Sequence, residues 1–579
     1  MDGIRRYDRD LIAVAVCIVA GVAISALPHF VEWLMTGHPV YIADHDELDD
    51  YMIVASHAYH SHPAYLTDPI CDDRSSYLPG LMMVPGILLT RVLRLSPIYM
   101  GFVWRVMAGV GMALTWYLIF RLYFPRRWLA LWLTLFALFD TNSWNGRPLV
   151  EHAALFVRLF VGVGRQLLAH NPQITGSWRI IDPALSWPLL LLYIWLMGRA
   201  VKSESQTAAR WAGAGFGLCF TYFYAWTAIA GGLFLALVLD GKRRRTYLTA
   251  GSIGALTGVL FLISGAMLKR EAVADWPTRF DFFLPIGHFS EFLIPKTAFI
   301  LAAITLIWVW RKDRDLLYLW CLCASALLLL NEQILTGLQI QNFHWYVVWG
   351  PTLWLLIVIA TVRTVDSWPS WRRIGAMAGY VALAFTIGTG IWMRVVETTQ
   401  TSESVELTRD WNEFQPEYER YRGLIQPGAV VAGAPTMVSF LVILNDDRLL
   451  SGYSVILSSC VDNKEWNRRI AADAYFSGLD RETFARREED GLERYVWGVW
   501  ARVPQLRRAL LKDRLAAFDE VAADPSAAAQ RFDLRYVVLP AAADDRHLKD
   551  DWISVIHGSY WQAWERKVSN RTDSSSASR

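Results

Sequence analysis

The residues with the clearest capacity for chemistry form a short acidic segment near the N-terminus, residues 44–51, with the sequence DHDELDDY. Five of its first seven residues are acids. Carboxylates this close together repel one another unless a cation or a cationic partner lies beside them. A carboxylate can also take a proton from an attacking hydroxyl or amide, so the segment is a candidate for general-base chemistry. The simpler alternative is a solvated loop that caps a helix beginning near Glu47.

The acidic segment comes soon after the first apolar run of the chain, residues 11–28, which follows Arg5 and Arg6. No small-residue cleavage site clearly follows this run, and more apolar runs do, so we interpret it as an uncleaved first transmembrane helix. Tyr51 begins a four-residue spacing of Tyr51, Ala55 and Tyr59. That spacing predicts an amphipathic helix, headed by the acids, along the membrane surface.

The composition is that of a membrane protein. Of 579 residues, 54% are hydrophobic and 19% are charged, whereas about a quarter of a soluble globular chain is charged. The net charge is +2, and no basic stripe lies outside the loops, which argues against nucleic acid as a partner. No Gly-rich phosphate loop and no GxGxxG is present, which argues against a nucleotide cofactor and against ABC-type transport.

Charged clusters separate the apolar runs, and about eleven transmembrane helices are predicted in residues 1–395. The candidate spans are 11–28, 99–121, 126–140, 183–199, 208–222, 225–240, 247–266, 296–310, 316–331, 345–362 and 374–394. Lys and Arg clusters fall on alternate loops, which predicts that the N-terminus and six basic loops face the cytoplasm. Ionisable residues are expected to avoid the spans, unlike those of a transporter. The chain is therefore expected in a bacterial inner membrane, in contact with its lipids.

The loops predicted to face outward carry most of the polar residues. They include 29–98, 141–182 and everything after residue 395. Binding and catalytic residues often lie on loops held by a rigid frame. Within 141–182, Glu151 and His152 are a candidate second acid or metal-binding element.

Three arginines of the second outer loop, Arg158, Arg165 and Arg179, are candidate phosphate ligands, because a guanidinium binds phosphate through two parallel hydrogen bonds. Arg158 and Arg165 are seven residues apart and would share one helix face. The alternative is that these side chains reach lipid headgroups at the interface.

A later outer segment, residues 331–345, contains Gln341 and His344 beside a Trp. Amides, an imidazole and an indole suit sugar hydroxyls and stacking on a sugar face, so both residues are candidate substrate ligands. The alternative is that the polar side chains cap helix ends.

Residues 396–569 are expected to form a periplasmic α/β domain. Strands are predicted at 430–432, 449–453 and 536–540, a helix at 437–444, and further helices across 462–522. The Ser-rich tail 570–579 is expected to be disordered. Cys71 and Cys460 fall on the same side in this topology, but spacing alone establishes no disulfide.

The order of a first span, an outer loop with the Asp46-Glu47 pair, a nearby Tyr51, an interfacial helix and a Pro-containing stretch resembles the GT-C glycosyltransferases. That superfamily includes protein O-mannosyltransferases and aminoarabinose transferases. The segment 215–226, GFGLCFTYFYAW, resembles the aromatic short-helix hairpin of many bacterial members. The resemblance in topology covers most of residues 1–395.

The resemblance implies an inverting transfer of a hexosyl or pentosyl group from a polyprenyl-phosphate donor to a glycan, lipid or protein acceptor. In that family the loop Asp is the general base or positions the acceptor and any metal. Asp46 matches that position best, with Glu47 and Asp44 as further catalytic candidates and Asp50 and Tyr51 as substrate ligands. The spacing from the acid pair to Tyr51 is one residue longer than in the familiar form, so the choice of carboxylate stays open.

A divalent metal, Mg or Mn, is left open by the resemblance, with Asp46 and Glu151 as candidate ligands. Two other classes of function remain alternatives. One is a lipid or polysaccharide transporter or flippase, and the other is a non-catalytic membrane scaffold whose outer domain binds a partner.

Overall fold

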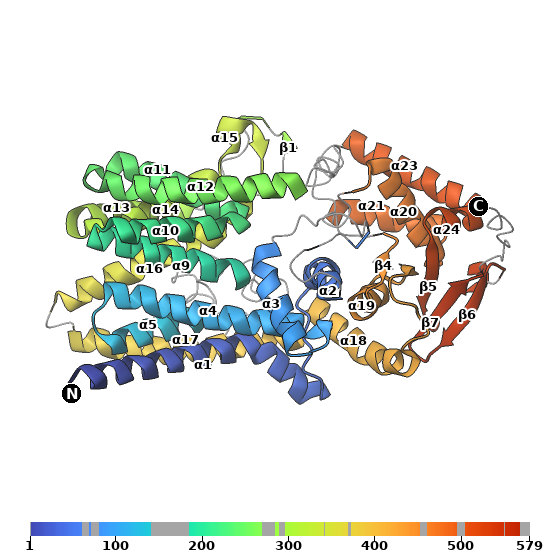
Figure 1. Cartoon of the computed structure of the whole chain (residues 1–579), viewed down its shortest axis with the longest axis horizontal. Coiled ribbons are helices and arrows are strands. Elements are labelled where there is room, and N and C mark those ends of the chain that lie inside the picture. Colours follow the sequence, from blue (N-terminus) through green and yellow to red (C-terminus); the bar gives the residue numbers. More distant parts are fainter. Residues whose placement is uncertain are drawn as a thin grey trace, which may run out of the picture.

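The computed structural model describes residues 2–567 apart from 61–65, 67–68, 71–79, 140–183, 269–283, 286, 289–295, 341, 369–371, 452–459, 495–503 and 549. Figure 1 shows two parts: long helices packed side by side, and a C-terminal part that joins helices with a small sheet. The helical part contains α1 (Asp2–Thr36), α4 (Met100–Tyr123), α5 (Arg127–Phe139), α9 (Ser186–Ser203), α10 (Gln206–Leu218), α11 (Phe223–Leu239), α12 (Arg244–Leu268), α13 (Lys296–Lys312), α14 (Leu317–Leu329), α16 (Tyr346–Asp366) and α17 (Arg372–Gln400).

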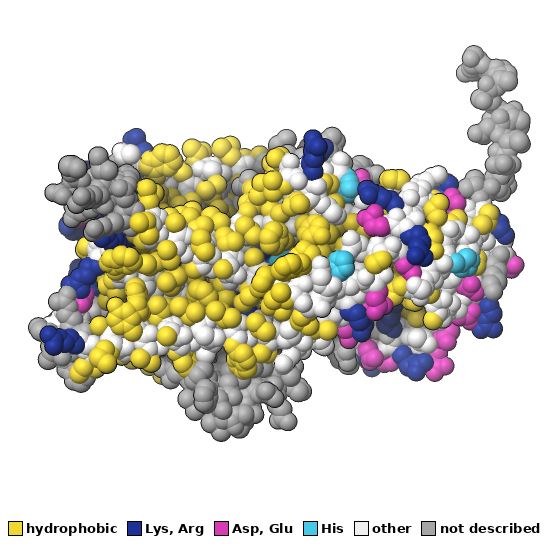
Figure 2. All heavy atoms as spheres, turned by 90° about the horizontal axis from the view of Figure 1, so that it is seen from below, with side chains coloured by type: hydrophobic (Ala, Val, Ile, Leu, Met, Phe, Trp, Pro, Cys, Tyr) yellow, Lys and Arg dark blue, Asp and Glu magenta, His cyan; other side chains and the backbone are white. Residues whose placement is uncertain are grey.

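Four helices within the described residues are long and apolar enough to cross a membrane: Asp10–Thr36, Pro97–Tyr123, Tyr346–Asp366 and Arg373–Gln400. A fifth span results if the bent pair Phe223–Leu239 and Gly241–Phe261, with 109° between its helices, is counted as one. On the face seen in Figure 2, a broad apolar surface covers the helices, and charged side chains lie at both ends of the molecule. The chain is a helical membrane protein.

The predicted count of about eleven spans is wrong by this measure. Every predicted apolar segment falls on a helix, but six of these helices, α5, α9, α10, α11, α13 and α14, have only 13 to 18 residues. A helix of 13 residues is about 20 Å long, and the hydrocarbon core is about 30 Å thick. Apolar runs predict helices well but do not establish that each helix spans.

Small residues bring the first two long helices together. α1 packs along α4, and a side chain at Gly21 or Gly109 would collide with the backbone of the other helix. Such close approach is typical of helix pairs in membranes, where small residues replace a hydrophobic driving force. α1 also continues to Thr36, eight residues beyond the predicted end of the first span.

Ion pairs join the basic loops at one end of the bundle. Arg121 lies 3.6 Å from Asp10, and Arg126 lies 3.5 Å from Asp366. Further pairs connect the loops after α9, α11, α13 and α16: Arg243–Glu204, Arg243–Asp315 and Arg363–Asp313. The predicted gathering of the basic loops on one side is confirmed, and that this side faces the cytoplasm stays a prediction.

Between α1 and α4 the chain forms the shorter elements η1 (Asp46–Met52), α2 (Ile53–His60), α3 (Gly80–Val92) and η2 (Pro97–Tyr99). The link from α11 to α12 contains η6 (Gly241–Arg243), and η5 (Cys219–Thr221) follows α10. The remaining short elements of this part are β1 (Leu284–Pro285), η9 (Arg314–Leu316), α15 (Gln333–Thr336), β2 (Leu338–Gln339) and η10 (Asn342–Trp345). β1 and β2 pair antiparallel.

The C-terminal part begins where α17 is followed, after one residue, by α18 (Ser402–Tyr421). Its helices are α19 (Pro435–Asn445), α20 (Asn463–Phe476), α21 (Arg481–Arg494), α23 (Pro504–Ala523), α24 (Pro525–Arg531) and η12 (Arg546–Leu548). Its strands are β3 (Val430–Gly433), β4 (Arg448–Leu449), β5 (Leu534–Pro540), β6 (Trp552–His557) and β7 (Trp561–Arg566). They form one sheet in the order β4-β3-β5-β7-β6, with β3 parallel to β4 and β5, and β7 antiparallel to β5 and β6.

Most predicted strands and helices of this part are present. β3, α19 and β5 match the predictions at 430–432, 437–444 and 536–540. The strand predicted at 449–453 is described only as the two-residue β4. The hairpin of β6 and β7 was not predicted, because its alternating polar and aromatic residues resemble an exposed loop when read locally. The tail 570–579 lies outside the described residues.

Candidate functional site

The acidic segment is a π-helix, η1, held between the helical bundle and the C-terminal part. π-Helical turns are rare and occur frequently at functional sites, because the wider turn changes where side chains point. Three of its polar or acidic residues, Glu47, Asp50 and Tyr51, are buried, and Asp46 is half-buried. The simple picture of a solvated loop is therefore wrong for most of the segment.

On the bundle side, Glu47 forms a two-pronged ion pair with Arg105 of α4. Arg105 Nη1 donates to Glu47 Oε1 at 2.8 Å, and Nη2 donates to Oε2. Each residue is 1% exposed. The backbone N–H of Ala43 adds a hydrogen bond to Glu47 Oε2 at 2.9 Å. A buried carboxylate is stabilised only by such a full set of partners.

Two rings and a glycine surround this ion pair. The Arg105 guanidinium lies 5.1 Å from the centre of the Tyr41 ring, a distance that permits a cation–π interaction. His29 Nε2 lies 3.4 Å from Arg105 Nη1, and His29 Nδ1 lies 2.9 Å from the Pro39 carbonyl oxygen. Gly101 leaves the space for the Glu47 carboxylate, since a Cβ there would overlap Oε1.

On the other side, the acidic segment is bonded to the C-terminal part. The His45 N–H donates to Glu403 Oε1 of α18 at 2.8 Å. The Ser439 hydroxyl of α19 donates to Asp49 Oδ1 at 2.7 Å, and Asp49 Oδ2 lies 2.9 Å from His45 Nδ1. The hydrogen bond and charge of Asp49 raise the pKa of His45 to about 9, so the imidazole is charged at neutral pH.

The helix after the segment continues this contact. α2 packs on α19, and His57 Nδ1 lies 2.7 Å from Asp446 Oδ1. The Ser56 hydroxyl donates to the Ile443 carbonyl, and His60 Nε2 lies 3.3 Å from the same oxygen. The helix predicted to lie along the membrane surface is therefore mostly buried, and Ser56, His57 and His60 bond it to the C-terminal part.

The five predicted residues of the first loop are brought together but in different environments. Asp44 Oδ1 accepts the Glu47 N–H at 2.8 Å and so caps the start of the π-helix. Glu47 faces the bundle, while Asp50 and Tyr51 are buried within the segment. Asp46 keeps contact with solvent.

Most candidates in later loops lie outside the described residues: Glu151, His152, Arg158, Arg165, Arg179 and Gln341. His344 is described, in η10 just before α16. Its ring stacks on Tyr224 with centroids 4.7 Å apart, and its Nδ1 lies 3.3 Å from the Tyr222 hydroxyl. The predicted aromatic hairpin and the predicted sugar ligand therefore meet in one cluster.

Arg105 was not among the predicted site residues, although the sequence carries a signal for it. The expectation that ionisable residues avoid the spans is wrong here, because Arg105 lies inside Pro97–Tyr123. An ionisable residue in an apolar span is a candidate functional residue by itself. Glu403 and Ser439 had no local signal, because a single Glu or Ser within a helical segment is common in any sequence.

A metal site is not assembled by the described residues. They contain no group of three or more His, Cys, Asp or Glu side chains placed to hold an ion. Of the two predicted metal ligands, Asp46 lies within the described residues and Glu151 lies outside them.

The cysteines differ between the two parts of the molecule. Cys17, Cys219, Cys321 and Cys323 are free and buried in the bundle, which agrees with their reading as small hydrophobic residues. Cys460 of the C-terminal part is disulfide-bonded.

No protein-family model matches the chain, and no curated protein matches it.

Proposed function

We propose that the protein is an integral membrane glycosyltransferase of GT-C type. It would move a hexosyl or pentosyl group from a polyprenyl-phosphate donor to an acceptor glycan, lipid or protein on the outer face of a bacterial inner membrane. The observation that carries the proposal is the position of the acidic π-helix between the apolar bundle and a polar domain. A donor that cannot leave the bilayer requires its catalytic carboxylate at such a boundary.

Asp46 is the proposed general base. It would take the proton from the acceptor hydroxyl as that oxygen attacks the anomeric carbon. The bond from the anomeric carbon to the phosphate oxygen breaks, and the lipid phosphate leaves with the electron pair, which inverts the configuration. Asp46 is half-buried, whereas Glu47 is buried and paired with Arg105.

Glu47 and Asp44 are assigned positioning roles in this proposal. Glu47 binds the π-helix to the bundle through Arg105, and Asp44 caps its first turn. Arg158, Arg165 and Arg179 remain the proposed cations for the leaving phosphate, which needs positive charge more than a proton. Asp50, Tyr51, Glu151, His152, Gln341 and His344 remain proposed substrate ligands.

The proposed orientation has two supports. The basic loops meet at the end of the bundle away from the C-terminal part (Figure 1), and basic loops favour the cytoplasmic side. The disulfide of Cys460 fits an oxidising compartment such as the periplasm.

The transfer is tested with membranes that contain the full chain and a polyprenyl-phosphate donor carrying a radiolabelled sugar. Asp46→Asn, alone and with Asp44→Asn, is expected to reduce transfer by about 10²- to 10⁴-fold, the usual contribution of a general base. The matched control is Asp366→Asn, which removes an exposed acid at the basic end and is expected to leave transfer unchanged. Undiminished transfer by Asp46→Asn at equal expression would overturn the site.

The same assay with EDTA, followed by Mg²⁺ or Mn²⁺, tests the metal requirement that the resemblance leaves open. Restored transfer on adding either ion would favour Asp46 and Glu151 as ligands.

A second candidate function, lipid transport, is favoured by one observation. Arg105 of the buried Glu47–Arg105 pair lies inside a span, and transporters use such intramembrane charges. Movement of a fluorescent polyprenyl-phosphate lipid across liposomes, abolished by Arg105→Gln but not by Asp46→Asn, would favour transport over transfer.

A further inference from the structure

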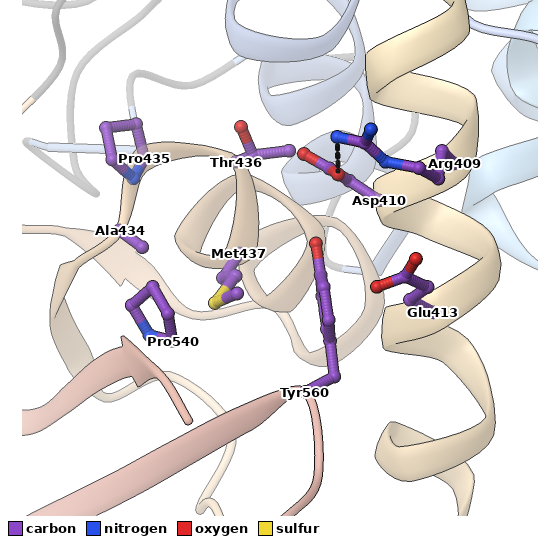
Figure 3. Close-up of a pocket in the computed structure, with 9 residues that line it drawn as sticks. All are labelled: Arg409, Asp410, Glu413, Ala434, Pro435, Thr436, Met437, Pro540 and Tyr560. Carbon is purple, nitrogen blue, oxygen red and sulfur yellow. Dashed lines mark hydrogen bonds and ion pairs between the residues drawn. The ribbon is translucent and has the colours of Figure 1, made fainter. Parts of the chain in front are cut away.

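A cavity of about 460 Å³ opens on the C-terminal part, lined in part by residues of α18 and of the first turn of α19 (Figure 3). It lies where the parallel strands β3 and β5 end, since Ala434 follows β3 and Pro540 is the last residue of β5. In sheets with parallel strands, ligands commonly bind outside the carboxyl ends of the strands. Its position therefore suits a ligand.

The wall of the cavity combines a ring with planar polar groups. Figure 3 shows the Tyr560 side chain standing between Met437 and Glu413, with its hydroxyl directed toward Asp410. Arg409, Asp410 and Glu413 come from adjacent turns of α18 and so share one helix face. The Arg409 guanidinium is exposed and lies 3.3 Å from Asp410 Oδ1. Together these side chains present donors and acceptors around an aromatic ring.

The charge of the cavity selects among ligands. Two carboxylates, Asp410 and Glu413, outnumber the single guanidinium of Arg409, so a phosphate or another anion would be repelled. Burial, followed by the Asp410 carboxylate, raises the pKa of Tyr560, so the phenol stays protonated and can donate. A neutral sugar ring fits this arrangement, since one face consists of C–H groups and its edge carries hydroxyls.

We propose that this cavity binds one pyranose unit of a neutral acceptor saccharide, with the ring on Tyr560 and hydroxyls bonded to Glu413, Asp410 and Arg409. The inference rests on the proposed function and names its acceptor class as a saccharide. In this proposal, the C-terminal part binds the acceptor.

The two helices that line the cavity also contact the acidic segment. α18 bonds to His45 through Glu403, and α19 bonds to Asp49 through Ser439. At 1.5 Å per residue, Glu403 and Arg409 are separated by about 9 Å along α18. An acceptor of a few sugar units can span such a distance, so one end can lie in the cavity while the other reaches the carboxylates.

The test is saturation-transfer NMR with the full chain in a detergent without a sugar headgroup, because maltoside detergents would compete. The probes are maltotriose and the methyl glycosides of glucose, galactose and mannose. At least one probe is expected to bind. Tyr560→Ala and Glu413→Gln are each expected to weaken that binding by about tenfold or more, the order expected for an aromatic contact or a charged hydrogen bond.

Glu419→Gln is the matched control for Glu413→Gln, because Glu419 is an exposed acid of the same helix that does not line the cavity. It is expected to bind the probe as the unmodified chain does. Failure of all probes to bind, or equal binding by Tyr560→Ala and the unmodified chain, would overturn the inference.

The outcome is separable from that of the proposed function. Asp46→Asn is expected to lose transfer while it keeps saccharide binding. If Asp46→Asn transfers normally but Tyr560→Ala still loses the probe, the proposed base is wrong and the saccharide site stands.

Discussion

The two sides of the acidic π-helix are held by opposite kinds of interaction. Toward the bundle, Glu47 and Arg105 form an ion pair that is 1% exposed at each residue. Toward the C-terminal part, Asp49 bonds to Ser439 and to His45, whose side chain is 47% exposed. One side is a dry contact between charges, and the other is a set of hydrogen bonds only partly open to water, since the Asp49 side chain is 25% exposed but Ser439 is 4% exposed.

The difference has an energetic consequence. Removing one partner of a buried pair leaves an unpaired charge out of water, whereas an exposed pair is screened and contributes little. The bundle side should therefore determine where the carboxylates lie. The hydrogen bonds of the domain side should determine how firmly the C-terminal part is attached to the acidic segment. Their loss should not unfold the protein.

Arg105→Gln should have the largest effect on this comparison. It leaves the Glu47 carboxylate buried without its guanidinium, so the free energy of unfolding should fall by about 3–5 kcal/mol. The measurement is denaturant or thermal unfolding in detergent micelles. Arg126→Gln removes a surface ion pair with Asp366 and should cost less than about 1 kcal/mol.

A second arm uses the double variant Arg105→Gln with Glu47→Gln. It removes both charges and should regain part of the lost stability. If Arg105→Gln proved as stable as Arg126→Gln, the bundle side would not be the tighter attachment.

Gly101→Ala should have an intermediate effect. The added Cβ overlaps Glu47 Oε1, so the carboxylate must move from Arg105, at a cost of about 1–3 kcal/mol in the free energy of unfolding. Gly379→Ala in α17 is the matched control, because a Cβ there meets nothing within 4 Å. An alanine favours the helix by up to about 1 kcal/mol, so the control should be neutral or slightly stabilised. Equal stability of the two variants would contradict the packing of Glu47 against α4.

The pH dependence of the domain side should be the smallest effect. Asp49 raises the pKa of His45 from 6.5 to about 9 in the folded protein. The stabilisation is fully present below pH 6.5 and is lost as the pH rises through about 9, because the unfolded imidazole is already neutral there. Hydrogen exchange of residues 44–51 should therefore increase across this range. His45→Gln should remove the dependence, and an unchanged profile in that variant would assign the titration to another group.

The sequence and the structure agree where the signal is local. The strand at residues 430–432, the helix at 437–444 and the strand at 536–540 are present as β3, α19 and β5. Each predicted apolar segment is helical, because a run of apolar residues favours burial as a helix whatever its neighbours are. The number of spans was overestimated because short apolar helices have the same composition as spans but not their length.

The candidate site was only partly predictable. The acidic segment and the aromatic hairpin were visible as clusters in the sequence. The sequence did not show that Glu47 faces the bundle while Asp49 faces the C-terminal part, because their partners are 58 and 390 residues away. A carboxylate's environment depends on what packs against it, and neighbouring residues do not contain that information.

Composition, the alternation of basic loops and the density of acids were determined by the sequence alone, because each depends on residue type and short-range spacing. Only the tertiary structure decided that Glu47 is buried against Arg105, that Asp46 keeps contact with solvent, and that α18 and α19 join these acids to a cavity lined by Tyr560. Those outcomes follow from long-range packing, which selects one partner for each charge among many that the sequence allows.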